Sequence, residues 1–242
     1  MSISQENIKV ADVSIDVIRK DIKNMHLAVY PPTGRIRLAA PSNTDPEVIR
    51  LFAISKLGWI KKHIKHFKNQ SREAPRDYVS GESHYYEGRR YLLNVIEHNG
   101  YNKIEIKNHK ELNLYVKPGT TKSQKAKVFK EWYRKQLKAQ IPELIEKWEK
   151  KIGVKANGWG VKHMRTKWGT CNIEEKRIWI NLELAKKPKN CLEYIIMHEL
   201  VHLLERNHND KFIALMNRFM PKWRAHRDEL NSLPVSHTDW GY

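Results

Sequence analysis

MHELVHLLERNH, residues 197–208, is the stretch from which the rest of this chain can be interpreted. It holds three histidines and two glutamates among large apolar residues. On an α-helix, residues four apart lie on one face, so the imidazoles of His198 and His202 can meet at one ion. Glu199 lies about 100° round the helix from His198, where it can face a water molecule without binding the ion. This spacing predicts a metal site with a general base beside it.

A third ligand is needed, because catalytic zinc is usually held by three protein side chains and keeps one open position. His208 follows His202 by six residues, and the asparagines on either side of it tolerate turn and left-handed backbone. The helix can therefore end before His208 and return this side chain toward the other two. We predict that His198, His202 and His208 bind one divalent transition metal, which we expect to be Zn²⁺, with Glu199 as the base.

The alternative is an ordinary core helix whose histidines face solvent. The stretch and the turn before it are apolar on several sides, at Leu192, Ile195, Ile196, Leu200, Val201, Leu203 and Leu204. Two histidines and a glutamate inside such a helix need polar partners, because burying an unpaired polar group is costly. A metal ion supplies those partners, so the metal site is the favoured interpretation.

Length and composition bound the class of protein. The chain has 242 residues, of which 40% are hydrophobic, enough for one large domain or two modest ones. Residues 1–16 lack a secretory signal, and no uncharged apolar run approaches the roughly 18 residues of a membrane span. Two cysteines, Cys171 and Cys191, cannot form a disulfide framework. We therefore expect a cytoplasmic protein without a membrane segment.

The net charge of +18, from 45 Lys and Arg against 27 Asp and Glu, has two interpretations. One is a non-specific contact with a polyanion such as nucleic acid. The other is solubility alone, from lysine-rich helix faces such as KKHIKHFK (61–68) and KEWYRKQLK (130–138). No RNA-binding, zinc-finger or basic-zipper signature separates the two, and both stay open.

Residues 1–119 read as a strand-rich N-terminal part with one helix. Alternating apolar and polar residues over 8–40 and 78–117 predict strands, and no internal repeat is visible. Asp45-Pro46 is typical of a helix start, which predicts a helix over about 46–67.

Residues 120–242 follow a different pattern. A helical stripe over 121–152 ends at Gly153, and Pro142 is expected to kink or split that helix. Residues 154–181 read as a hairpin or short meander. Pro188 begins the helix that carries the opening stretch, and a last helix is expected over about 210–230. The predicted fold class is α+β.

Several stretches carry a resemblance to a known family. The stronger ones are RTKWGTC (165–171), IWINLEL (178–184), YIIMHELVHL (194–203) and NHNDKF (207–212). Looser similarity covers RIRLAAP (35–41), LGWIKKH (57–63) and GRRYLLNV (88–95). On these residues the sequence resembles the YgjP-like metallopeptidase-domain family, which is related to the SprT and WLM zinc proteins.

The resemblance implies a zincin-like metallopeptidase core in residues 120–242, with an H-E-x-x-H active-site helix. It also implies His198, His202 and His208 as ligands and Glu199 as base. It leaves the substrate open, because one relative is described as a UTP pyrophosphatase. A metal-activated water can attack either a carbonyl or a phosphoryl centre.

Two cations within the predicted hairpin, Arg165 and Lys167, bear on the choice between the two substrate classes. Arg165 and Lys167 are interpreted as a cationic clamp on an oxyanion or phosphate, with exposed cations beside a core tryptophan as the alternative. We predict that Arg165 assists catalysis and that Lys167, Trp168 and Asn181 contact substrate. For Asn181 the alternative is a cap or turn.

Together these observations predict a metal-dependent hydrolase, most simply a peptidase that acts on peptide substrates. A nucleoside-triphosphate pyrophosphatase that uses the same metal site is the alternative. A nucleic-acid-binding module with a structural metal is a third hypothesis, disfavoured because structural zinc usually has four side-chain ligands. In that case Glu199 would also have no task.

Overall fold

The computed structural model describes residues 5–30, 34–69, 73–164 and 167–234. Within these ranges it contains three small sheets and six α-helices, which confirms the predicted α+β class. The chain divides between residues 71 and 72 into two compact units. None of the described helices combines the length and the apolar character needed to cross a membrane.

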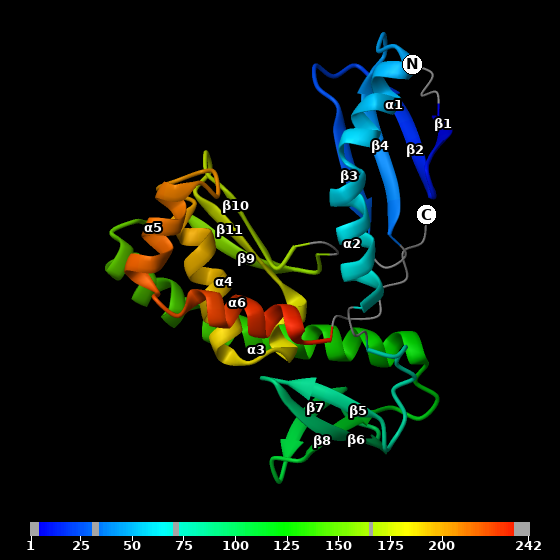
Figure 1. Ribbon diagram of the computed structural model, residues 1–242. Coiled ribbons are helices and arrows are strands. Elements are labelled where there is room, and N and C mark those ends of the chain that lie inside the picture. The colour runs from blue at the N-terminus through cyan, green and yellow to red at the C-terminus, as the bar shows by residue number, and fades with distance from the viewer. Residues whose placement is uncertain (1–4, 31–33, 70–72, 165–166, 235–242) are drawn as a thin grey trace. The chain divides into compact units, whose positions relative to one another are not determined.

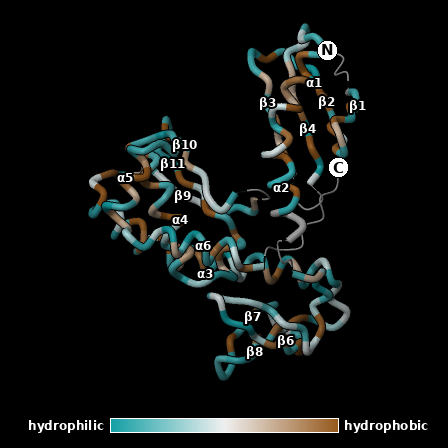
Figure 2. The backbone as a smooth tube through the Cα atoms, in the orientation of Figure 1, coloured by the Kyte–Doolittle hydropathy of each residue, from teal (hydrophilic) through white to brown (hydrophobic). Residues whose placement is uncertain are grey.

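The first unit is a four-stranded sheet covered on one face by helices (Figure 1). Its strands are β1 (Gln5–Val10), β2 (Val13–Lys20), β3 (His26–Tyr30) and β4 (Arg35–Pro41). They lie in the order β1-β2-β4-β3, with β2 and β4 parallel and both outer pairs antiparallel. Figure 2 shows hydrophobic stretches along β2 and β4, the two central strands. Their inward side chains form this unit's core.

The helix expected over 46–67 is two helices, α1 (Pro46–Ser55) and α2 (Leu57–Asn69). Asp45 caps α1 as predicted, and its carboxylate accepts a hydrogen bond from the Glu47 amide at 2.7 Å. The break follows Ser55, whose hydroxyl donates to the Phe52 carbonyl at 2.7 Å. Such a bond back to the preceding turn often bends a helix.

The second unit opens with a sheet of the same topology. Its strands are β5 (Ser83–Tyr86), β6 (Arg89–Glu97), β7 (Lys103–Lys107) and β8 (Glu111–Val116). The order β5-β6-β8-β7 and the strand directions repeat those of the first sheet. A side-chain-capped helix follows each sheet, after Asp45 and after Thr121. The chain therefore contains a structural repeat that its sequence does not reveal, because the copies share alternation and capping rather than residue identity.

Helix α3 (Lys122–Ile152) covers the second sheet and extends beyond it. Thr121 and Gln124 form a capping box, and Gly153 ends the helix with φ 78°, as predicted. Pro142 lies inside the helix without splitting it, because Ile141 and Ile145 on either side are buried. Residues of β5–β8 and α3 share one core, so the compact units divide near residue 71 rather than at the expected boundary, 119.

The remaining elements surround helix α4 (Lys189–Val201), which is buried on most sides. Strands β9 (Gly158–Lys162), β10 (Gly169–Asn172) and β11 (Arg177–Asn181) form a sheet in the order β10-β11-β9. A 3-10 helix, η1 (Leu182–Lys186), leads into α4. The last helix expected is instead α5 (Asp210–Phe219) and α6 (Trp223–Ser232), because Pro221 interrupts it. Helix α4 packs against α3, β10 and α6 (Figure 1).

Candidate metal centre

Helix α4 positions His198 and Glu199 in its last turn. Its first helical residues follow Pro188, and its middle residues are held in the core. His202 is the C-cap residue and keeps helical backbone angles, φ −62° and ψ −18°. The side chain of His202 therefore stays on the same face as that of His198, one turn further along.

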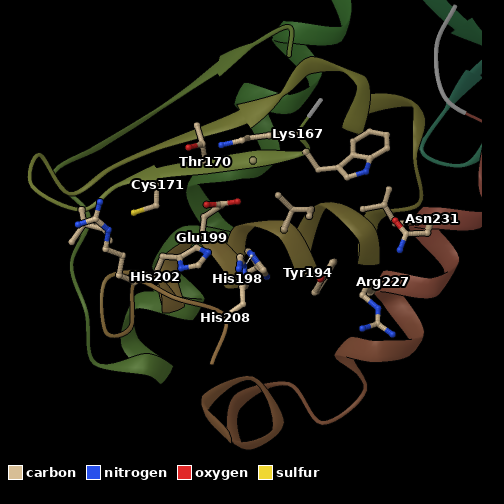
Figure 3. Close-up of a pocket in the computed structure, with 16 residues that line it drawn as sticks. Lys167, Thr170, Cys171, Tyr194, His198, Glu199, His202, His208, Arg227 and Asn231 are labelled. Atoms are coloured by element: carbon tan, nitrogen blue, oxygen red, sulfur yellow. Dashed lines mark hydrogen bonds between the residues drawn. The ribbon is translucent and has the colours of Figure 1, made fainter. Parts of the chain in front are cut away.

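The chain returns His208 to this face after α4 ends. Asn209 then caps α5, with its side-chain oxygen accepting from the Phe212 amide at 3.0 Å. One ligand nitrogen from each of His198, His202 and His208 lies within 4.8 Å of the other two (Figure 3). The Nε2 atoms of His198 and His208 are 3.0 Å apart. Nitrogens bound tetrahedrally to one zinc ion at about 2.0–2.1 Å would lie roughly 3.3 Å apart.

The surroundings of His198 and His202 favour neutral imidazoles. Burial, reinforced by the other two histidines, lowers the pKa of His198 to about 3, and burial also lowers the pKa of His202. Phe212 is buried beside all three histidines, its ring centroid 4.7–5.0 Å from each imidazole. Neutral imidazole is the form that binds a metal.

Hydrogen bonding also fits a metal at this point. The Nδ1–H of His202 donates to the Glu205 carbonyl at 3.1 Å, which leaves its Nε2 lone pair for the centre. The Nδ1 atom of His198 is buried and has no hydrogen-bond partner among the described residues. His198 faces His208 through its other nitrogen, Nε2, so the metal site is inferred from the convergence of the three imidazoles and not from this unpartnered atom. The donor set suits a divalent transition metal.

Glu199 is 5% exposed and lies on the side of α4 that faces β10 (Figure 3). It fits against Gly169, where an added Cβ atom would lie 2.5 Å from Glu199 Oε1. Burial raises the pKa of Glu199 to about 8, and the charge of Lys167 opposes that shift. The side chain is therefore a carboxyl group that can exchange a proton near neutral pH.

Replacing Gly169 by Ala is expected to lower kcat about 100-fold, because the new methyl group must displace the Glu199 carboxyl group. Zinc content should stay unchanged, since the three atoms nearest that methyl group all belong to Glu199. Gly158→Ala on β9 is the matched control, because its Cβ would meet no atom within 4 Å. Equal kcat values for the Gly169 variant and the wild type would contradict this packing argument.

A cavity of about 500 Å³ contains the three histidines and Glu199. Its walls come from β10, from α4, from the segment that leads to His208, and from α6 (Figure 3). Lys167 and Trp168, predicted as substrate contacts, line this cavity. Arg165, predicted to assist catalysis, lies outside the described residues. The roles of all these residues stay predictions.

Asn181 does not line the cavity and takes the alternative role, a turn and cap. Its Nδ2 donates to the carbonyls of Met164 at 2.9 Å and Lys167 at 2.7 Å. Its Oδ1 accepts from the amides of Met164 at 3.3 Å and Glu183 at 3.2 Å. The side chain is 4% exposed, so its hydrogen bonds are used within the protein. Asn181 thereby holds the segment that carries Lys167.

We expect Asn181→Ala to reduce the free energy of unfolding by about 2–4 kcal/mol, because it removes several buried hydrogen bonds. Urea denaturation would measure the change. Asn172→Ala, at an exposed position on β10, should cost less than about 1 kcal/mol. Similar losses in both variants would contradict the role assigned to Asn181.

The sequence did not point to the residues that α6 contributes. Arg227, Leu230 and Asn231 line the cavity, and so does Arg206, which lies between His202 and His208 in the sequence. The spacing of Arg227 and Asn231, four residues apart, places them on one face of a helix. Nothing in the sequence alone sets that face against the metal centre, because the packing of α6 on α4 is a tertiary contact.

Comparisons with known proteins give one family match over most of the chain. The family described as "YgjP-like, metallopeptidase domain" matches residues 23–233. The chain is similar to the crystal structure of the metallopeptidase zymogen of Pyrococcus abyssi abylysin, with 16% identity over 37% of this chain and 90% of that one, at a TM-score of 0.35. It is also similar to the metallopeptidase zymogen of Methanocaldococcus jannaschii jannalysin, with 22% identity, the same coverage and a TM-score of 0.33. No curated protein matches this chain.

Proposed function

This chain belongs to the YgjP-like family, and on that premise we propose that it is a zinc-dependent peptidase whose catalytic base is Glu199. The family description places the chain among metal-dependent peptidases. The observation that carries the finer proposal is the meeting of three histidine nitrogens beside a buried carboxyl group in one cavity. A base next to a metal site with an open position is the arrangement that hydrolysis requires.

His198, His202 and His208 would hold the metal, and an all-imidazole donor set suits zinc. When bound, zinc supplies a Lewis acid that makes water more acidic and polarises a carbonyl group. Phe212 packs against the three imidazoles, and burial lowers the pKa of His198 and His202, which favours their neutral, metal-binding form. The hydrogen bond from His202 to the Glu205 carbonyl sets the tautomer that binding needs.

Glu199 would accept a proton from the water that attacks the peptide carbonyl carbon. The carboxyl group then gives that proton to the amide nitrogen as the carbon–nitrogen bond breaks, which leaves a free acid and a free amine. Gly169 leaves room for the Glu199 side chain. The charge of Lys167 at the same cavity favours the anionic form of Glu199 and would also favour negative charge on the carbonyl oxygen.

A peptide is favoured over a nucleotide by the strand that lines the cavity. Among the described residues β10 is an edge strand, because β11 pairs with only one of its sides. An open strand edge can bind an extended main chain through backbone hydrogen bonds. A nucleoside triphosphate would instead be held by cations around its phosphates; because Lys167, Arg206 and Arg227 line this cavity, the preference for a peptide rests on the strand edge and the family description. The two alternatives are a nucleoside-triphosphate pyrophosphatase and a nucleic-acid-binding module with a structural metal. Assays for pyrophosphate release and for nucleic-acid binding test them against the peptidase.

Metal removal tests the proposal. Protein stripped with a chelator should cleave an unfolded protein substrate at background rate, and one equivalent of Zn²⁺ should restore cleavage. Mass spectrometry of the fragments measures the result. Cleavage that is equally fast before and after stripping would contradict a metal-dependent peptidase.

A further inference from the structure

Apart from the Glu199 carboxyl group, the charged side chains of the described residues that line the cavity are all positive. Lys167, Arg206 and Arg227 contribute cations, and Glu199 is the only carboxyl group among the described lining residues. The cavity as a whole therefore attracts negative charge. Because Glu199 is assigned to proton transfer, the cations are available to a ligand.

Arg227 is the cavity cation that packs against the aromatic rings leading to the histidines, although its side chain is 43% exposed. Its guanidinium carbon lies 5.2 Å from the ring centroid of Trp223, which is buried. The Trp223 ring stacks on Tyr194 at 6.4 Å, and the Tyr194 ring meets that of His198 at 5.9 Å. A continuous row of rings thus connects Arg227 to the histidines, and Figure 3 shows Tyr194 between them.

The guanidinium is partly neutralised but keeps donors for a ligand. Arg227 pairs with Asp228 through Nε and Nη2, each 2.9 Å from Oδ1. The Asp228 side chain is 65% exposed and does not line the cavity. An exposed pair of this kind contributes little and exchanges readily with another carboxylate. Asn231, one turn further along α6, adds an amide group to the same wall.

We propose that Arg227, assisted by Asn231, binds a carboxylate of the peptide substrate and gives the enzyme a preference for acidic peptides. This inference rests on the proposed function. A planar carboxylate matches the paired N–H donors of a guanidinium. Leu230 and Trp168 line the same cavity and give it an apolar wall beside these polar groups. A single carboxylate also suits a cation that already has one partner, whereas a triphosphate carries several charges.

Two carboxylate sources are possible, a free C-terminus and an Asp or Glu side chain. One quenched-fluorescence peptide made in four forms separates them. The C-terminus is either a free acid or an amide. The residues near the cleaved bond are either all Glu or all Gln, which gives the four combinations. The ratio of kcat/KM between acidic and neutral forms measures the preference.

Arg224 provides a matched control on the same helix. Its guanidinium carbon also stacks on Trp223, at 4.5 Å, and its Nη1 donates to Asn217 at 2.7 Å. Arg224 does not line the cavity. If Arg227→Gln loses the preference for acidic peptides and Arg224→Gln keeps it, Arg227 acts by binding substrate. Packing against Trp223, which both arginines share, would then not explain the loss.

The wild type should favour the acidic peptide about 10- to 100-fold, the effect of one charge-assisted contact. Arg227→Gln should reduce that ratio toward one, mainly by raising KM on the acidic form. Arg227→Glu should reverse the preference toward a Lys-containing peptide. Equal rates on acidic and neutral peptides in the wild type, or equal losses in the Arg224 and Arg227 variants, would overturn the proposal.

Binding to zinc-loaded Glu199→Gln keeps this test independent of turnover. Calorimetry should give tighter binding of the acidic peptide than of the neutral one, and the difference should vanish when Arg227→Gln is added. That result would support the subsite even if the wild type cleaves no peptide, in which case the proposed function alone would fail. Binding of UTP, but of neither peptide, through Arg227 would overturn the carboxylate proposal.

Discussion

Glu199→Gln is expected to lower kcat on a peptide by about 10²–10⁴-fold while zinc content stays at that of the wild type. The amide of Gln has nearly the same shape as the carboxyl group but cannot accept a proton from water. The measurement pairs kcat at saturating peptide with elemental analysis of the same sample. Retention of most activity by a zinc-loaded Gln variant would move the base to another residue and reopen the structural-metal hypothesis.

Unfolding is the other explanation for an inactive variant, and the burial of Glu199 argues against it. Burial raises the pKa of Glu199 from 4.5 to about 8 in the absence of metal. The folded state then binds the proton more tightly than the unfolded state, so the stability contributed by this group falls as pH rises between these values. Without metal, the Glu199→Gln variant should therefore have a free energy of unfolding at pH 8 at least as large as that of the wild type. Urea denaturation measures both values.

The second large effect concerns the histidines. His198→Ala, His202→Ala and His208→Ala should each weaken zinc binding about 100-fold or more. A zinc-binding free energy of about 10–16 kcal/mol, divided among three protein ligands and a water, gives roughly 3 kcal/mol for each. Competition with a coloured chelator measures the affinity.

His226 is the matched control for these variants. It lies on α6, where its Nδ1 is 3.0 Å from Asn190 Nδ2, and it is not part of the histidine centre. His226→Ala should bind zinc as tightly as the wild type. Unchanged zinc affinity in the His198 and His202 variants would show that the metal, if any, binds elsewhere.

Local spacing was enough to predict the centre of the site. His198 and Glu199 lie in the last turn of α4 and His202 is its C-cap residue with helical backbone angles, so their relative placement follows from helix geometry. The return of His208 was predicted from the turn-forming asparagines beside it, and the structure places its ring beside the other two. Helix ends at Asp45, Thr121 and Gly153 also depend on residues next to them in sequence.

Features that depend on tertiary packing were not predicted. The boundary near residue 71 follows from α3 covering β5–β8, a packing contact that the local patterns of the two segments do not reveal. The repeated sheet topology left no trace, because inward positions need only be apolar: Ile36 and Leu38 in one copy, Leu112 and Leu114 in the other. Pro221 was a visible helix breaker, and its effect on the last helix was not anticipated.

One measurement tests the central claim most directly: turnover of an unfolded peptide library and of the four nucleoside triphosphates by the same zinc-loaded protein, with Glu199→Gln alongside. The account predicts new peptide termini from the wild type, loss of that cleavage in the Glu199 variant, and no pyrophosphate from any nucleotide. Pyrophosphate release from UTP that Glu199→Gln abolishes, without peptide cleavage, would contradict it and assign the site to phosphoryl chemistry.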